Sequence, residues 1–143
     1  MSVVKHKIID EIGLIEISNP PVNAISAAVR IGLLETIEKL SSNEKVKAIV
    51  ITAPERTFLA GADIKEFGKK VDAPILGKIC DKIESLNKIV VASLHGTPLG
   101  GGLEVAMSAH YRIAAPNTKV GLPEVLLGIL PGAGGTQRLP RLC

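Results

Sequence analysis

The sequence predicts a fold of the α/β class, because runs of β-branched and apolar residues alternate with segments that have the spacing of amphipathic helices. Two continuous apolar runs, at Val46–Thr52 and Ile89–Leu94, are typical of strands that are covered on both faces. Between them, apolar residues recur at steps of four, four and three from Ile75 to Leu86, which indicates a helix. Strand, strand and helix follow one another repeatedly, so we expect a sheet built from repeated turns of the chain.

A β-hairpin is predicted at the N-terminus, where the runs Val3–Ile9 and Leu14–Ser18 flank the turn residues Asp10–Gly13. Two prolines in the loop Asn19–Ala24 exclude a helix there, because proline lacks the backbone N–H donor. A helix follows, with Ser26 as its N-cap and an end near residues 41–43. Its apolar stripe consists of Val29, Leu33, Ile37 and Leu40.

The C-terminal half contains shorter elements separated by loops of small residues. One such loop, Ala53–Ala62, follows the first apolar strand, and residues 95–102 follow the second. The pattern then predicts a helix at Leu103–Ala109, a short strand at Tyr111–Ala114, a helical turn opening at Val120–Glu124, and a glycine loop at Pro131–Arg138 that enters another helix.

The composition limits the functions to consider. The 143 residues have the length of one domain, which can bury about two thirds of its unfolded surface without disulfides or metal. Aromatic residues make up 2%, so the stacking platforms that bind single-stranded nucleic acid are absent, and a net charge of +3 does not indicate a nucleic-acid partner. Two cysteines without a CxxC pair fit a reducing compartment. No apolar run has the length of a membrane span or of a signal-peptide core.

Three common kinds of site are excluded by spacing. The glycine-rich segments have neither the Gly-Lys-Ser/Thr of a phosphate-binding loop nor the last glycine of a dinucleotide fingerprint, because Gln137 stands at that position. His6, His95 and His110 lack the spacing of a metal pair, so we expect no metal. No serine stands in the Gly-x-Ser-x-Gly elbow of a serine hydrolase. The basic stretch Lys65–Lys70 is interpreted as a solvated helix face in preference to a phosphate site.

The segment Gly100–Gly102 joins an apolar strand to a helix. Backbone N–H groups that no side chain shields can hold an oxyanion there, and a tight turn that simply needs glycine is an equal alternative. Glu104 and Glu124 stand in apolar surroundings, each near a predicted helix start. Each either caps its helix or is desolvated and acts as a general base or acid. Two such acids are what the addition of water to a double bond requires, although their sequence spacing does not show that they meet.

The motifs resemble those of the crotonase, or enoyl-CoA hydratase/isomerase, superfamily from about Ile12 to the last residue. Three signatures carry the resemblance in the family's order: FLAGADIKE at residues 58–66, LGGGLEVA at 99–106, and GLPEV at 121–125 followed by PGAGGTQRL at 131–139. The segments at 19–26 and 110–114 resemble the N-terminal hydratase part of peroxisomal L-type bifunctional enzymes. The resemblance implies a crotonase-like ββα spiral, with residues 1–143 as a partial domain whose C-terminal part is missing.

The resemblance also implies roles for individual residues. The backbone N–H groups of Ala62 and Gly101 are expected to form an oxyanion hole for the thioester oxygen. Glu104 and Glu124 are expected to hold a water, with Glu104 helping to activate it and Glu124 protonating the α-carbon. Residues expected to line the substrate and CoA channel are Asn23, Ala24, Ala60, Gly61, Asp63, Ile64 and Gly100, with Lys65 or Lys69 near the CoA phosphates.

The expected activity is hydration of a 2-trans-enoyl-CoA to the 3-hydroxyacyl-CoA in fatty-acid β-oxidation, with double-bond isomerisation as a second activity. No cofactor is expected, since NAD serves only a dehydrogenase part that this chain does not contain. The alternative is a truncated chain that binds acyl-CoA, or associates with full-length subunits, without turnover. Family domains are longer, so we expect exposed apolar surface and self-association. A peroxisomal location is implied by the resemblance alone, because no targeting signal is visible in this chain.

Overall fold

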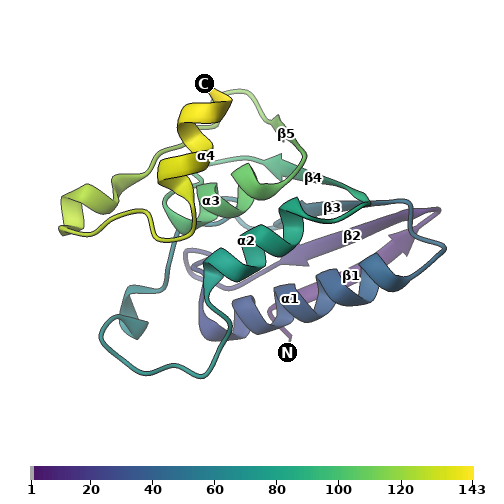
Figure 1. The fold of residues 1–143 in the computed structure, drawn as a ribbon, viewed down its shortest axis with the longest axis horizontal. Helices are drawn as coiled ribbons and strands as arrows, with labels where there is room; N and C mark the ends of the chain where they lie inside the picture. The colour runs from purple at the N-terminus through teal and green to yellow at the C-terminus, as the bar shows by residue number, and fades with distance from the viewer. Residues whose placement is uncertain (1) are drawn as a thin grey trace.

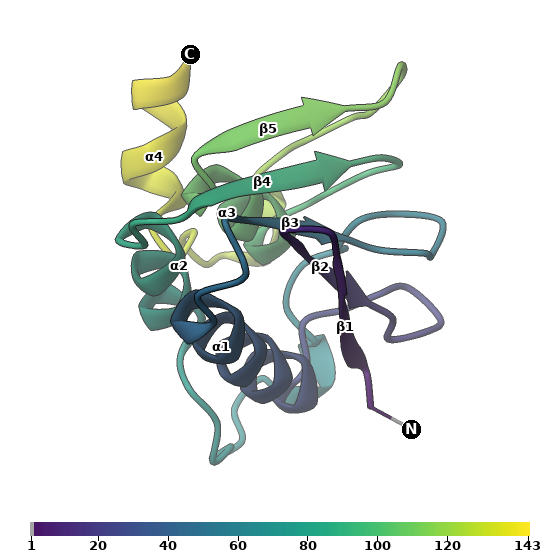
Figure 2. The same ribbon diagram turned by 90° about the vertical axis from the view of Figure 1, so that its right-hand side faces the viewer.

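A mixed five-stranded β-sheet is the centre of the computed structural model, which describes residues 2–143. The strands lie side by side in chain order (Figures 1 and 2). The first pair is antiparallel and each later pair is parallel. The strands are β1 (Val4–Ile9), β2 (Ile12–Ile17), β3 (Ala48–Thr52), β4 (Ile89–Leu94) and β5 (Tyr111–Ala114). Since parallel neighbours need a crossover connection, the helices between them complete an α/β architecture, and the predicted class is confirmed.

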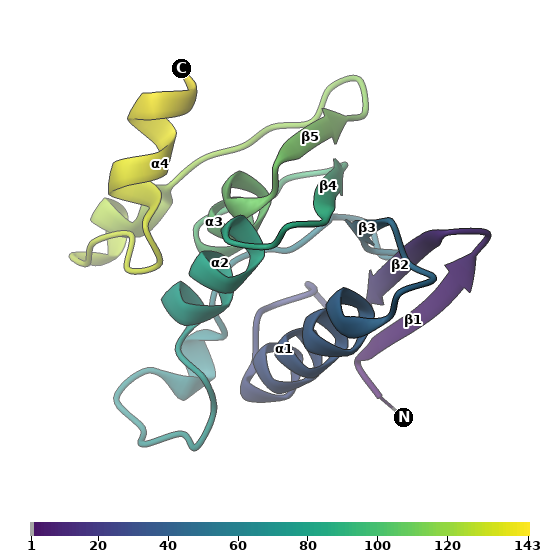
Figure 3. The same ribbon diagram turned by 45° about the vertical axis from the view of Figure 1, so that its right-hand side comes forward.

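The helices form a row beside the sheet, with α1 and α2 on one face and α3 and α4 continuing beyond α2 (Figures 1 and 3). Helix α1 packs on β1 and β2, α2 packs on α1 and α3, and α3 packs on α4. Their bounds are α1 (Ala27–Ser42), α2 (Leu76–Glu84), α3 (Gly101–Ser108) and α4 (Gly135–Leu142), with short 3-10 helices η1 (Ile64–Glu66) and η2 (Pro123–Leu127). No helix within residues 2–143 is both long and apolar enough to cross a membrane.

Helix α1 forms as its sequence predicts. The Ser26 hydroxyl accepts a hydrogen bond from the Val29 N–H, which confirms the predicted N-cap. The four predicted stripe residues are all buried in the core, because residues three and four positions apart share one face of a helix. The helix ends at Ser42 with Asn43 as its C-cap, in agreement with the predicted end near residues 41–43.

The hairpin has a tighter turn than predicted. Ile9 pairs directly with Ile12, so the turn is only Asp10 and Glu11, with Asp10 at a φ of 54°. Gly13 lies inside β2 and is not a turn residue, which corrects the prediction. A Cβ at Gly13 would stand 2.9 Å from a methyl group of Leu40, so this glycine allows the end of α1 to pack closely on the strand.

Two predictions about burial are wrong in part. Strands β3 and β4 alternate between fully buried residues and residues that are half-buried or exposed, rather than being covered on both faces. The reason is that successive side chains point to opposite faces, and the helices cover one of them. In the predicted stripe of α2, Ile79 and Ile83 are buried, but Ile75 is 64% exposed because it precedes the helix as its N-cap.

A second, shorter set of extended segments connects the strands to the helices. Ile25 forms a parallel bridge with Ala62, and Leu99 forms one with Gly121. Each of these residues follows one of the strands β2 to β5 and precedes the next helical segment, so each turn of the chain runs strand, short extended segment, helix. The second strand of the predicted strand, strand, helix repeat is therefore reduced to a single bridge. Ala62 lies in one of these bridges, Gly100 and Gly101 follow Leu99, and Glu104 and Glu124 lie in the helical segments that come next.

Candidate active site

A cavity of about 370 Å³ opens where the segments that follow β3, β4 and β5 meet. Its wall is mostly apolar, and two acidic side chains face it. Eight of the residues singled out in the sequence line it: Ala60, Gly61, Ala62, Ile64, Gly100, Gly101, Glu104 and Glu124. Residues more than 60 positions apart in the sequence are thus brought to one place by the repeated turns of the chain.

Two residues that line this cavity, Ala62 and Gly101, have backbone N–H groups that are not used within the described part of the protein. Within residues 2–143, neither Ala62 N–H nor Gly101 N–H donates to a carbonyl or a side chain. They are neighbours in space, because a Cβ built on Gly101 would lie 3.8 Å from the Ala62 nitrogen. The preceding residues, Gly61 and Gly100, have φ angles of 104° and 50°, a conformation that favours glycine. The arrangement leaves two donors free for an acceptor atom in the cavity.

Close packing holds the N-terminus of α3 in place. Leu99 N–H donates to the Leu59 carbonyl at 3.3 Å. A Cβ on Gly102 would collide with the same carbonyl oxygen, so only glycine permits this approach. All eight residues of α3 are buried, which fixes the direction in which the first N–H groups of the helix point.

Glu104 is buried in the first turn of α3, with 3% of its surface exposed. Its Oε1 accepts hydrogen bonds from the N–H groups of Ala133 and Gly135, both at 2.8 Å. The other oxygen, Oε2, has no donor among the described residues. The loop before α4 therefore orients this carboxylate, and one oxygen is left for a group in the cavity.

Glu124 is carried by η2, whose first residue is Pro123, and it is half-buried. Its Oε1 lies over Gly100, where a Cβ would stand only 2.8 Å away. Its Oε2 is buried and has no hydrogen-bond partner within residues 2–143. A buried carboxylate oxygen without a partner is costly unless a ligand or water satisfies it, which marks this atom as one that meets a bound molecule.

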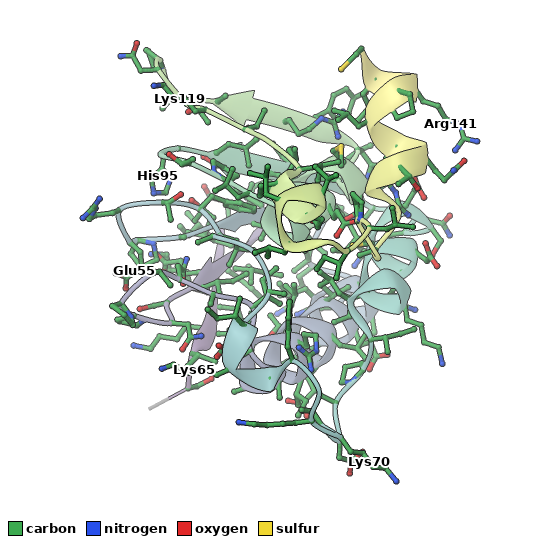
Figure 4. The ribbon with its side chains drawn as sticks, turned by 90° about the vertical axis from the view of Figure 1, so that its left-hand side faces the viewer. Glu55, Lys65, Lys70, His95, Lys119 and Arg141 are labelled. Atoms are coloured by element: carbon green, nitrogen blue, oxygen red, sulfur yellow. The ribbon has the colours of Figure 1, made fainter. Side chains whose placement is uncertain are left out.

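A neighbouring cavity of about 320 Å³ shares Ala62, Phe67, Ile75 and Leu76 with the first one. Asp63 and Lys69 line it, together with the Arg30 and Glu66 ion pair at 3.0 Å. Figure 4 shows Lys65 and Lys70 extending away from the body of the molecule. The predicted helix face at residues 65–70 is wrong, because only Ile64–Glu66 forms a 3-10 turn and the following residues form a loop.

Asn23 and Ala24 line neither cavity. The Asn23 side chain is completely buried, and its Nδ2 donates to the carbonyls of Ile17, Thr57 and Phe58. Its Oδ1 accepts from Asn19 N–H at 2.8 Å. With its polar atoms used in this way, Asn23 holds the loop before α1 against the segment before the cavity instead of facing a ligand.

Sequence reasoning missed the residues that hold Glu104. Ala133 and Gly135 were singled out only as part of a glycine loop, and Arg138 only as part of a motif. In the structure Arg138 is buried and donates to the Ala133 carbonyl at 2.9 Å. An arginine within one turn of a glycine loop is the available signal, but its partners come from α2 and cannot be read from local sequence.

Comparison with known proteins agrees with this architecture. The chain is 52% identical over 131 residues to the peroxisomal bifunctional enzyme of Danio rerio, a match that covers 92% of this chain and 18% of that protein. It is 41% identical over 148 residues to the probable enoyl-CoA hydratase of Bacillus subtilis (strain 168), which covers 99% of this chain and 57% of the relative. The chain thus spans less than two thirds of the length of these relatives.

The fold matches the crystal structure of enoyl-CoA hydratase from Thermoplasma volcanium GSS1 with a TM-score of 0.90 and 35% identity, over 99% of this chain and 60% of that one. The predicted crotonase-like fold is therefore confirmed. A family model described as enoyl-CoA hydratase/isomerase matches residues 7–143. On this evidence the chain belongs to the enoyl-CoA hydratase/isomerase family.

Proposed function

We propose that this chain hydrates a 2-trans-enoyl-CoA to the 3-hydroxyacyl-CoA. The observation that supports the proposal most directly is the meeting of two carboxylates, Glu104 and Glu124, with two free backbone N–H groups at one cavity. Hydration of a thioester-conjugated double bond needs these two kinds of group, because it moves protons and gathers negative charge on the thioester oxygen.

The N–H groups of Ala62 and Gly101 are proposed to bind the thioester oxygen. When water adds to the β-carbon, the electron pair of the double bond moves toward the carbonyl, and the oxygen becomes enolate-like. Donors fixed in position act mainly on this transition state, and one such donor is worth about 10²–10³ in rate. Neither N–H group donates a hydrogen bond within residues 2–143, and this supports the proposed role.

Glu104 and Glu124 are proposed to hold the attacking water between them. Glu104, as the base, helps to take a proton from the water as the water oxygen bonds to the β-carbon, and Glu124, as the acid, delivers its own proton to the α-carbon. Proton exchange with solvent then returns the two carboxyl groups to their starting forms. The reaction adds H and OH and leaves no net oxidation or reduction, so it requires no NAD or other redox cofactor. The unpartnered Oε2 of Glu124 is available for this transfer.

Isomerisation of the double bond is proposed as a second activity of the same site. It moves a proton from one carbon of the acyl chain to another, which a single carboxylate at the Glu124 position can do while the same N–H pair holds the enolate. The CoA part is proposed to follow residues 60–64 toward the second cavity, where Lys69, which lines that cavity, is the candidate for binding its phosphates.

A peroxisomal role in fatty-acid β-oxidation is proposed from the names of the relatives. The protein of Danio rerio is named a peroxisomal bifunctional enzyme, and a relative of Arabidopsis thaliana that is 46% identical is named a peroxisomal fatty acid beta-oxidation multifunctional protein. The Bacillus subtilis relative shows that the family also occurs outside peroxisomes.

The test is the hydration of crotonyl-CoA, followed by the loss of the absorbance of the conjugated thioester. We expect activity in the unchanged chain and a loss of about 10²–10⁴ in kcat for Glu124→Gln and for Glu104→Gln. Lys70→Gln, an exposed change in the loop before α2, is the control and keeps full activity. If the unchanged chain binds the CoA ester but is no faster than buffer, hydration is refuted and the alternative of binding without turnover stands.

A further inference from the structure

The two buried charged side chains within residues 2–143, Glu104 and Arg138, both form hydrogen bonds to the loop at residues 133–135. Glu104 Oε1 accepts from the N–H groups of Ala133 and Gly135, and Arg138 Nη1 donates to the Ala133 carbonyl at 2.9 Å. Burying a charge is costly without partners, so the Glu104 carboxylate depends on the loop N–H groups for compensation. We propose that Arg138 is a positioning residue that orients the Glu104 carboxylate through residues 133–135.

The backbone of the loop transmits this contact. Gly134 has a φ of 97°, and a Cβ there would collide with the Arg138 guanidinium. Gly135 is also restricted, although less severely, since a Cβ would stand 3.0 Å from Glu104 Oε1. With Ala133 bound at both its N–H and its carbonyl, a shift of the guanidinium moves the two donors that fix the carboxylate.

Helix α2 anchors the other edge of the guanidinium. Arg138 donates to both oxygens of Glu84, at 3.3 Å and 2.8 Å, and to Asp81 at 2.9 Å. The hydrogen bonds to Glu84 raise the pKa of Arg138, so its charge is constant over the working pH range. The planar guanidinium group has five N–H donors, so it can donate to two carboxylates and a carbonyl at the same time. A lysine ammonium cannot reproduce that geometry.

The inference rests on the proposed function, in which Glu104 helps to activate water. A displacement of about 1 Å at a reacting group costs about 10² in rate. We therefore expect Arg138→Gln to lower kcat in crotonyl-CoA hydration by about 10²-fold with little change in KM. Arg138→Lys keeps the charge and restores part of the loss. Arg141→Gln on the same helix is the matched control, because Arg141 is exposed and points away from the body in Figure 4.

A double-mutant comparison separates positioning from general stability. If Arg138 acts through Glu104, Arg138→Gln costs little further rate in a Glu104→Gln background, but costs its full factor in a Glu124→Gln background. All assays are made well below the melting temperature of the least stable variant. Equal losses in both backgrounds, or a loss that appears only in KM, would overturn the proposal.

An amide measurement tests the contact without any activity. In the 15N-labelled chain, Arg138→Gln is expected to speed hydrogen exchange at Ala133 and Gly135 at least tenfold relative to Arg141→Gln, with the α1 amides unchanged. Exchange at these two amides within twofold of the control refutes the proposal. An inactive unchanged chain would refute the proposed function alone, since the exchange result still decides whether Arg138 fixes the loop.

Discussion

At the scale of single residues, Gly100 connects backbone conformation to the chemistry of the site. Its φ of 50° favours glycine, and the space where a Cβ would lie is occupied by Glu124 Oε1 at 2.8 Å. Gly100→Ala should therefore displace the Glu124 carboxylate and strain the backbone together. We expect crotonyl-CoA hydration to fall by about 10²-fold, as for a misplaced reacting group.

The control for this change is Gly68→Ala. Gly68 has a φ of 73° but no atom within 4 Å of the added Cβ, so the variant has the strain without the collision. It should lose about 1–2 kcal/mol of stability and keep its activity. Equal activity in the two variants would show that Gly100 does not keep space for Glu124.

Cys80 gives a prediction about pH. Burial raises the pKa of its thiol to about 12. In the unfolded chain a thiol ionises near pH 8.5, so above that pH the unfolded state loses a proton that the folded state keeps. The contribution of Cys80 to stability is complete below about pH 8.5 and falls by about 1.4 kcal/mol per pH unit toward pH 12.

Urea unfolding at pH 8, 9 and 10 measures this effect. We expect the unchanged chain to lose stability faster with rising pH than Cys80→Ala, which has no thiol at this position. If the free energy of unfolding fell equally with pH in both proteins, the buried thiol would not contribute to the pH dependence. The other cysteine, Cys143, is exposed and is present in both proteins, so it does not distinguish them.

At the scale of elements, Lys88 joins the end of α1 to the start of β4. Its Nζ donates to the carbonyls of Leu40 at 3.0 Å and Asn43 at 2.6 Å, in the last turn and at the C-cap of the helix. A cation at this end also interacts favourably with the negative end of the helix dipole. We expect Lys88→Met to lower the free energy of unfolding by about 1–2 kcal/mol in urea titration.

Lys82→Met serves as the comparison for this cap. Lys82 is exposed on α2, and its ammonium forms no ion pair or hydrogen bond among the described residues, so the substitution should change stability by less than about 0.5 kcal/mol. A loss in Lys88→Met no larger than in Lys82→Met would contradict the capping role. Both variants should retain the hydration rate, since neither side chain lines the cavity.

Elements with a local cause were predictable from sequence. The stripe of α1 follows from periodicity, the position of β4 follows from its continuous apolar run, and Ser26 follows from capping chemistry. Gly13 was misread because its function is a close approach to Leu40, a contact from a distant element. The role of Arg138 could not be predicted for the same reason, because its partners on α2 lie more than 50 residues away in the sequence. Asn23 was predicted from its motif to line the substrate channel, but in the structure its buried side chain forms hydrogen bonds that link two loops.

At the scale of the whole molecule, the site depends on the repeated turn of strand, bridge and helix. No single turn contains the site: Ala62 follows β3, Gly101 and Glu104 follow β4, and Glu124 follows β5. The sequence motifs indicate which residues belong to the site, while the stacking of three turns determines that they meet. The chemistry therefore requires most of the chain to be folded at once.

The same turns leave an apolar surface around η2. Val125, Leu126, Leu127 and Leu130 are between 62% and 83% exposed, four large apolar side chains within six positions. Contiguous exposed apolar surface of this kind favours association. We expect the sedimentation coefficient to rise with protein concentration, and we expect the double variant Leu126→Lys with Leu130→Lys to remove this dependence. Val22→Lys, an exposed apolar position in the loop before α1, is the control and should associate like the unchanged chain. A concentration-independent monomer in the unchanged chain would refute self-association through η2.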